Sequence, residues 1–281
     1  MPAEIQRREG RDFSLFRSRH VAENFAEIRR AEDVPELLKI AGERGLGTVF
    51  LGGGSNIFFA SRRIRQLVMK NALPEVVEHL GGDRFRVSSS VPMLKLLRRM
   101  KELGRDCFYC LASAPCQIGG AIAMNAGSGP GEGISVSDYI ESVEAANAEG
   151  LLTLKKSELG FGYRRSAFLD NPDLFAVGAV FVFPKKKIAG DPIAERMEWA
   201  REHQDLRFPN CGSLCSRYDA RILRLVRALY RFCPAGLSGK KLNWAQNRSE
   251  NPAWLASMLR LIEILHALAG RELKFELRIV R

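Results

Sequence analysis

"LGGGSNIFF" occupies residues 51–59 and continues from "TVFL" (48–51), a short apolar run that predicts a buried strand. Three consecutive glycines let the backbone adopt positive φ and turn successive N–H groups toward one point, which suits a pyrophosphate. The loop matches neither the Walker pattern G-x-x-x-x-G-K-[ST] nor the Rossmann pattern G-x-G-x-x-G. A glycine-rich turn alone is more often only a turn, so further segments must decide its role.

Two further segments strengthen the interpretation of this loop as a ligand site. "IGGAIAMNAG" (118–127) supplies a second glycine pair and Asn125, and "FGYRRSAF" (161–168) places Tyr163 and Arg164 beside the start of a strand. Two glycine-rich loops and an arginine together make a large nucleotide cofactor plausible. Taken alone, Arg164 is better explained as a surface charge.

The remaining pattern predicts an α+β chain with a first part of about 185 residues and a second of about 95. Helices are expected over 31–45, 91–104, 216–233 and 252–270. Strands are expected over 85–90 and 174–184, over 272–280, and as two strands joined by the turn "NAEG" (147–150). The charged helical stretch 185–209 predicts a connection between the two parts.

Composition and charge narrow the class of protein. The 281 residues are 46% hydrophobic with a net charge of +11, which is ordinary for a soluble globular chain apart from the charge. The basic residues are scattered and accompany no known nucleic-acid motif, so no nucleic-acid partner is expected. The N-terminus has no apolar signal region, and the longest apolar run, 175–183, is too short to span a bilayer. A cytoplasmic protein without membrane insertion is predicted.

The six cysteines allow two readings. "CFYC" (107–110) and "CGSLC" (211–215) could together offer four thiolates to zinc, although the second spacing is less typical of zinc sites. Reduced, buried use of cysteine as a small side chain is the preferred interpretation in a cytosolic chain. No metal site is therefore predicted.

Taken in order, the segments resemble the MurB family, the UDP-N-acetylenolpyruvoylglucosamine reductases of peptidoglycan synthesis. "LGGGSNIFF", "IGGAIAMNAG" and "LGFGYRRSAF" are similar to family signatures, "CGSLCS" (211–216) to its Gly-Ser-Val-Phe-Lys-Asn, and "ELKFELRIV" to its terminal Leu-x-Pro-Glu-Val. The resemblance runs from about residue 13 to the end and is loosest in the C-terminal third. No long insertion follows the FAD region, as in the shorter of the family's two forms.

The resemblance implies an α+β fold with an FAD-binding domain of the vanillyl-alcohol-oxidase (PCMH) type in two subdomains, followed by a smaller α+β substrate domain. The corresponding segments are 1–72 and 73–188 for FAD and 189–281 for the substrate. FAD would be bound by eight residues of the two loops. They are Gly52, Gly53, Gly54, Ser55 and Asn56, with Gly119, Gly120 and Asn125.

The resemblance also implies a reaction, in which NADPH reduces FAD and the flavin then delivers hydride to C3 of an enolpyruvyl nucleotide sugar. Arg164 would stabilise the carboxylate of the enolate-like intermediate, because its planar guanidinium is permanently charged. Ser213 would donate the proton to C2, and Glu276 would orient the intermediate. Tyr163 and Arg217 would contact the substrate. Without the resemblance, Glu276 would be assigned to the solvent-facing side of a strand.

Several positions depart from the family pattern. Cys116 replaces a glycine before the second loop, and Cys215, Ser216 and Arg217 replace Phe-Lys-Asn after Ser213. Segment 235–254 lacks the usual Ser-x-Lys-His-x-Asn. The FAD site is thus better kept than the substrate site, and two alternatives stay open: a diverged flavoprotein acting on another nucleotide-linked sugar, or a non-catalytic protein that binds flavin or a partner. The oligomeric state is not predicted.

Overall fold

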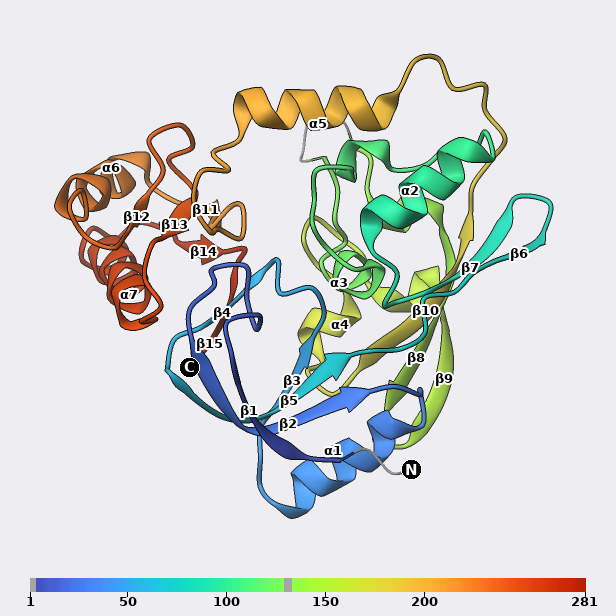
Figure 1. Ribbon diagram of the computed structural model, residues 1–281, viewed down its shortest axis with the longest axis horizontal. Coiled ribbons are helices and arrows are strands. Elements are labelled where there is room, and N and C mark those ends of the chain that lie inside the picture. The colour runs from blue at the N-terminus through green and yellow to red at the C-terminus, as the bar shows by residue number, and fades with distance from the viewer. Residues whose placement is uncertain (1–3, 129–132) are drawn as a thin grey trace. The chain divides into compact units, whose positions relative to one another are not determined.

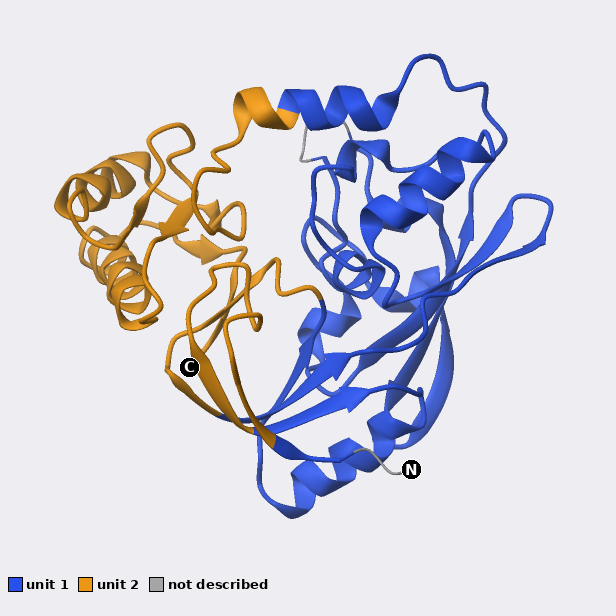
Figure 2. Ribbon diagram, viewed as in Figure 1, with its two compact units in different colours: residues 1–6, 24–52, 65–199 blue, residues 7–23, 53–64, 200–281 orange. Residues whose placement is uncertain are grey.

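A computed structural model describes residues 4–128 and 133–281 and divides the chain into two compact units (Figures 1 and 2). Unit 1 comprises Met1–Gln6, Asn24–Gly52 and Arg65–Trp199, and unit 2 comprises Arg7–Glu23, Gly53–Ile64 and Ala200–Arg281. The chain therefore enters unit 2 three times, and one of the divisions falls inside the first glycine loop. In the part that the structure describes, no helix is long and apolar enough to cross a membrane.

A four-stranded sheet is built from the N-terminal quarter of the chain. Its strand order is β1-β2-β5-β3, with β3 and β5 parallel, and its members are β1 (Gln6–Gly10), β2 (His20–Ile28), β5 (Arg63–Asn71) and β3 (Thr48–Leu51). Helix α1 (Asp33–Glu43) joins β2 to β3 and buries Val34, Leu37, Leu38 and Ala41, the i, i+3, i+4, i+7 pattern of an amphipathic helix. These side chains share one core with Ile28, Leu67 and Met69.

An antiparallel five-stranded sheet lies within unit 1. Its order is β6-β7-β10-β8-β9, and its members are β6 (Val77–Gly81), β7 (Arg84–Ser88), β10 (Phe175–Val182), β8 (Ile140–Asn147) and β9 (Gly150–Lys155). Because side chains alternate along a strand, Phe85 and Phe181 lie in the core, while Arg84 and Arg86 pair on the other face with Glu141 and Glu144.

Short helices of unit 1 lie between these strands in the sequence and share the core of the five-stranded sheet (Figure 1). They are α2 (Met93–Glu102), α3 (Ile118–Ala123) and α4 (Ala167–Asp170), with single turns η1 (Tyr109–Leu111), η2 (Val136–Tyr139) and η3 (Lys156–Leu159). The amphipathic pattern of α2 puts Leu96, Leu97 and Met100 into the core.

Unit 2 contains three small two-stranded pairings around the core that holds Phe16, Phe58, Leu223 and Ile262. The pairs are β15 (Arg278–Val280) with β4 (Ile57–Phe59), β11 (Cys215–Arg217) with β14 (Lys274–Phe275), and β12 (Ala235–Leu237) with β13 (Ala245–Asn247). Its helices are α6 (Ala220–Leu229) and α7 (Ala253–Leu268), while α5 (Pro192–His203) crosses the division between the units.

The predicted α+β class is confirmed, and most predicted elements lie where the pattern placed them. The expected strand over 272–280 is divided into β14 and β15, because Glu276 and Leu277 both donate backbone hydrogen bonds to the Leu214 carbonyl. Strands β2 and β5 were not predicted. The division into 1–72, 73–188 and 189–281 remains a prediction about domains, distinct from the two compact units.

Candidate functional site

The first glycine loop begins where β3 ends. Gly54 has φ +71°, and a Cβ atom there would lie 2.9 Å from the Phe13 carbonyl oxygen, so the position requires glycine. The Leu15 N–H donates to the Gly54 carbonyl at 2.9 Å and holds the loop against residues 13–15 within unit 2. Gly53 and Ser55, on either side of Gly54, are both half-buried.

Two polar side chains of unit 1 flank Gly52. The Lys70 ammonium donates to the Gly52 carbonyl oxygen, and the Gln117 Oε1 atom lies 3.1 Å from where a Gly52 Cβ would be. Gln117 Oε1 is buried and accepts no hydrogen bond from the described residues, a costly arrangement unless a ligand supplies the partner. A cation and an unused amide beside a glycine turn fit the anionic and polar groups of a dinucleotide such as FAD.

The two glycines of the second loop have different roles, one in packing and one in keeping the backbone accessible. A Cβ atom at Gly119 would lie 2.8 Å from the Ser89 Cβ, and the Gly119 N–H donates to the Ser89 carbonyl at 2.8 Å. Gly119 thus allows α3 to pack closely on the chain after β7. A Cβ atom at Gly120 would meet nothing within 4 Å, so Gly120 keeps the backbone accessible for a ligand.

Arg164 and Asn125 lie together in unit 1. The Arg164 guanidinium donates to the carbonyls of Gly127 at 3.0 Å and Asn125 at 3.4 Å, and Asn125 Nδ2 donates to the Gly162 carbonyl at 3.0 Å. Both residues have positive φ, +53° and +41°, a conformation that costs free energy outside glycine and concentrates at functional sites. The Tyr163 ring, 55% exposed, lies with its centroid 5.1 Å from the Arg164 Cζ atom.

A second cluster in unit 2 brings together three predicted residues from distant parts of the sequence. The Glu276 N–H donates to the carbonyl of Leu214, the residue after Ser213, at 2.8 Å. Asn56 Nδ2 donates to the Glu276 carbonyl at 2.9 Å, and the Arg278 N–H donates to the Asn56 carbonyl at 3.1 Å. The end of the first glycine loop, the Ser213 loop and the terminal glutamate therefore form one connected backbone network.

The Ser213 loop is held from its other side by Asn243, which sequence analysis missed. Asn243 Oδ1 accepts from the Cys215 N–H at 3.0 Å, Nδ2 donates to the Cys215 carbonyl at 2.7 Å, and the Asn243 carbonyl accepts from Leu214 at 2.8 Å. Ser213 itself forms an antiparallel bridge with Trp244. Asn243 closes the family pattern Ser-x-Lys-His-x-Asn, and nothing local in the sequence shows its partner 28 residues away.

Contrary to the expectation from the sequence, segment 235–254 keeps most of this pattern. Ser238, Lys240 and Asn243 stand at the pattern's spacing, and only the histidine is replaced, by Lys241. Ser238 Oγ donates to the buried Asp205 carboxylate at 2.7 Å and accepts from the Lys240 N–H at 3.0 Å. The kept residues therefore shape this turn and connect it to the Ser213 loop.

Arg217 lies away from these hydrogen bonds. Its guanidinium donates to the Glu272 carboxylate at 2.7 Å, and both side chains are about two-thirds exposed. Neighbouring Ser216 is bonded to the Lys274 carbonyl at 3.3 Å. The two residues that replace the family's Lys-Asn are thus engaged with the strand pair β11–β14, and the substrate contact of Arg217 stays a prediction.

All six cysteines are free thiols. No group of three potential metal ligands occurs among residues 4–128 and 133–281. Burial raises the pKa of the Cys116 thiol to about 12, that of Cys211 to about 11 and that of Cys215 to about 12. These thiols are protonated at neutral pH and are poor nucleophiles, which argues against a covalent link from Cys116 to a flavin and assigns Cys211 and Cys215 to packing.

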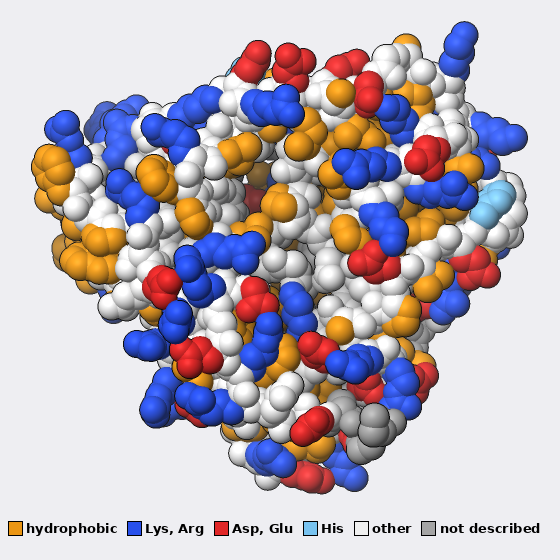
Figure 3. Space-filling model, in the orientation of Figure 1, with side chains coloured by type: hydrophobic (Ala, Val, Ile, Leu, Met, Phe, Trp, Pro, Cys, Tyr) orange, Lys and Arg blue, Asp and Glu red, His pale blue; other side chains and the backbone are white. Residues whose placement is uncertain are grey.

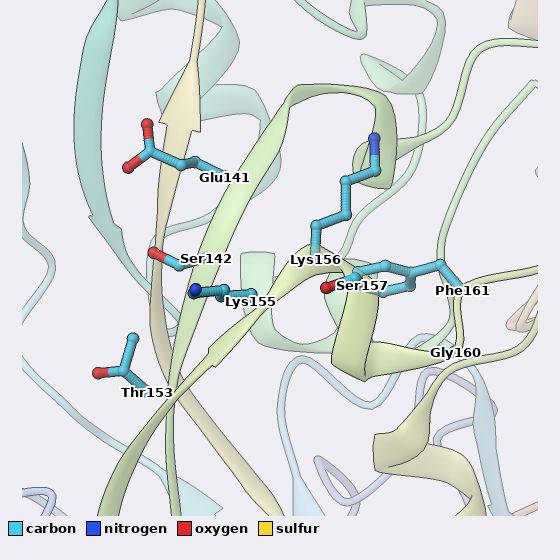
Figure 4. A pocket seen from close by; sticks show the side chains of 8 residues that line it. All are labelled: Glu141, Ser142, Thr153, Lys155, Lys156, Ser157, Gly160 and Phe161. Atoms are coloured by element: carbon cyan, nitrogen blue, oxygen red, sulfur yellow. The ribbon is translucent and has the colours of Figure 1, made fainter.

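A surface depression near η3 carries no assigned role. Figure 4 shows the side chains that line it, with Glu141 and Lys156 pointing apart. The Glu141 carboxylate is already paired with Arg84 at 2.6 Å. The residues that line the depression are Glu141, Ser142, Thr153, Lys155, Lys156, Ser157, Gly160 and Phe161.

Comparison with known proteins identifies the family to which the glycine loops and the Ser213 loop belong. The family model of the FAD binding domain matches residues 22–154. A UDP-N-acetylenolpyruvoylglucosamine reductase of Geobacter sulfurreducens is 29% identical over 232 residues, covering 80% of this chain and 72% of the relative. The enzyme of that name from Aquifex aeolicus is 31% identical over 192 residues, covering 67% and 63%. The crystal structure of the MurB reductase from Thermus caldophilus superposes with a TM-score of 0.78 at 20% identity, covering 99% of this chain and all of that one.

The chain belongs to the MurB family. It has the family's α+β fold, with the FAD-binding domain of the vanillyl-alcohol-oxidase type, and its cofactor is FAD. The resemblance drawn from the glycine loops is therefore confirmed. The roles of the individual site residues stay proposals.

Proposed function

We propose that this protein is a cytoplasmic, FAD-dependent reductase that uses NADPH to convert UDP-N-acetylglucosamine enolpyruvate to UDP-N-acetylmuramate, a step of peptidoglycan synthesis that serves cell wall growth, cell shape and division. The observation that carries the proposal is the shared name of relatives aligned over most of the chain. The hydrogen bonds that join Glu276 to Asn56 and to Leu214, the residue after Ser213, support it, because the family places its proton donor and glutamate at the positions of Ser213 and Glu276.

Bound FAD would supply the chemistry of hydride transfer between NADPH and C3 of the enolpyruvyl group. In our proposal Gly52 to Asn56, Gly120 and Asn125 hold the cofactor, with Lys70 beside the first loop to balance the pyrophosphate charge. Gly119 contributes by allowing the second loop to pack on Ser89. The glycine turns supply N–H donors without side chains in the way.

Ser213 would then give its proton to C2 of the substrate. A hydroxyl is a weak acid, so it acts only when fixed in position and assisted electrostatically. The Ser213 loop is held in position by hydrogen bonds of the two residues that follow Ser213. Leu214 bonds to the backbone of Glu276 and Asn243, and Cys215 bonds to the Asn243 side chain. We assign Arg164 to the carboxylate of the intermediate, since a planar guanidinium presents N–H donors that match the two oxygens of a carboxylate.

The test is a purified, FAD-loaded protein assayed for NADPH oxidation with and without UDP-N-acetylglucosamine enolpyruvate. The proposal predicts oxidation that depends on the enolpyruvyl sugar. A protein that cannot be loaded with FAD would sink the proposal and its flavoprotein alternative together.

A diverged reductase of another nucleotide-linked sugar is the second candidate. The exposed Arg217–Glu272 pair favours it, because a lysine and an asparagine stand after the serine in the family pattern. FAD-loaded protein that ignores the enolpyruvyl sugar but oxidises NADPH with another UDP-sugar would select this candidate. FAD binding without turnover on any such sugar would leave the non-catalytic alternative.

A further inference from the structure

Helix α6 presents apolar side chains to solvent. Its inward face buries Leu223 and Val226. On the outward face, Leu225, Leu229 and Phe232 are 49%, 58% and 92% exposed. Leu225 and Leu229 stand at i and i+4, the spacing that a helix normally uses to bury one face, and Phe232 lies in the turn directly after the helix.

Helix α7 also exposes apolar side chains. Trp254, Ile264 and Leu268 are 42%, 41% and 80% exposed. The two helices pack against each other, and the Tyr230 hydroxyl at the end of α6 donates to Ser257 Oγ near the start of α7 at 3.0 Å. We call the six exposed residues the α6–α7 apolar face. They are Leu225, Leu229, Phe232, Trp254, Ile264 and Leu268.

Arginines accompany the apolar residues of α6 and of the turn that follows it. Segment 220–233 contains four arginines and no acidic residue, and Arg221, Arg224 and Arg231 are exposed. Within the described ranges, no carboxylate pairs with any of these three. The Arg231 guanidinium lies 5.3 Å from the centroid of the Phe232 ring. Figure 3 shows basic and hydrophobic side chains together over α6 and α7, at the left of the view.

We propose that the α6–α7 apolar face docks onto an anionic lipid surface, with arginines at the headgroups and Leu229 and Phe232 in the interface. A basic helix with an exposed apolar stripe is the pattern of a segment that lies on a membrane without spanning it. An anionic membrane supplies the opposite charge to the arginines of segment 220–233, which contains no acidic residue.

A second copy of the chain fits this surface less well. In a two-fold dimer the same patch meets itself, so Arg221, Arg224 and Arg231 would face their own copies and repel. A membrane also needs no complementary groove for Phe232, which is 92% exposed.

The experiment uses the full, FAD-loaded chain in co-sedimentation with two kinds of vesicle, pure phosphatidylcholine and phosphatidylcholine with phosphatidylglycerol. Wild type is expected to bind the anionic vesicles, with binding weakened by salt. Equal binding to both vesicles, or none to either, would overturn the proposal.

Two variants test the two parts of the surface. Leu229→Ser with Phe232→Ser removes apolar anchors and should lower the partition coefficient by on the order of tenfold or more. The triple change of Arg221, Arg224 and Arg231 to Gln should lower it by on the order of a hundredfold, about fivefold for each charge. Binding to anionic vesicles unchanged in either variant would contradict the assignment.

Matched controls change unit 1 instead. Leu151→Ser removes an exposed leucine from β9, and Lys39, Lys155 and Lys156 changed to Gln remove three exposed charges. Each control variant should bind anionic vesicles better than the α6 variant that it matches. Unchanged flavin content and melting temperature would verify that all four variants are folded. A wild-type dimer seen by light scattering, dissociated by Phe232→Ser and without vesicle affinity, would instead identify a second copy as the occupant.

Discussion

Replacing Asn243 with alanine tests how the Ser213 loop is held. The Asn243 amide satisfies both backbone groups of Cys215, at 3.0 Å and 2.7 Å, and Cys215 is only 3% exposed. Each buried backbone group left unpaired costs about 1–3 kcal/mol. Since Asn243 is half-buried and water can reach part of the gap, we expect Asn243→Ala to lower the free energy of unfolding by about 3 kcal/mol.

The functional effect should be confined to one half of the reaction. Ser213 lies two residues before Cys215, and a misplacement of about 1 Å at a reacting group can cost about a hundredfold in rate. Stopped-flow absorbance of the flavin follows both halves: reduction by NADPH, and reoxidation by UDP-N-acetylglucosamine enolpyruvate. Asn243→Ala should slow the reoxidation by on the order of a hundredfold and leave the reduction nearly unchanged.

Asn147→Ala is the matched control. Its side-chain oxygen accepts two backbone N–H groups in the turn between β8 and β9, at 2.9 Å and 3.2 Å, so the change also removes two hydrogen bonds. It should lower stability without separating the two half-reactions. A loss in urea unfolding of Asn243→Ala below about 0.5 kcal/mol, the range of ordinary surface substitutions, would refute the structural role of Asn243. Equal slowing of both half-reactions would refute its role in positioning Ser213.

Three further outcomes follow from the structure. Gly54→Ala should reduce the FAD content of the purified protein, because alanine would strain the positive φ of +71°; normal flavin content would show that the loop tolerates a side chain. Lys70→Met should weaken FAD binding in a titration without changing the melting temperature of the apoprotein by more than a few degrees, and unaltered affinity would exclude a role for its charge. Burial lowers the pKa of His20, so as pH falls below about 6.5 the unfolded chain takes up a proton that the folded chain resists. Protonation of this group should then lower the free energy of unfolding by at most about 1.4 kcal/mol per pH unit. In urea unfolding between pH 7.5 and 5.5, the stability of His20→Gln should fall less steeply than that of wild type. Identical slopes would contradict this.

The sequence predicted those parts of the fold that carry a clean local pattern. The run "TVFL" before three glycines predicted β3 and its loop, and "NAEG" predicted the hairpin of β8 and β9. Strand β5 was missed because "RIRQLVMKN" mixes charged residues with its buried ones. Without β5 in the sheet, Lys70, which pairs in register with Leu51, could not be placed beside the glycine loop.

The site residues depended more on the resemblance than on local pattern. Ser213 and Glu276 come together through the carbonyl of Leu214, a contact that spans more than 60 residues of sequence. Asn243 and Gln117 were missed since each acts on distant backbone, the first on Cys215 and the second near Gly52. Physical pattern predicted which loops could bind, and tertiary contacts decided which side chains reach them.

The central claim is tested most directly by the reoxidation of NADPH-reduced enzyme. Wild type should be reoxidised when UDP-N-acetylglucosamine enolpyruvate is added without oxygen. Ser213→Ala should be reduced by NADPH as wild type is, yet remain reduced after the sugar is added, because the proton for C2 is missing. Wild type that stays reduced would contradict the proposed substrate, and Ser213→Ala that is reoxidised as fast as wild type would contradict the proposed proton donor.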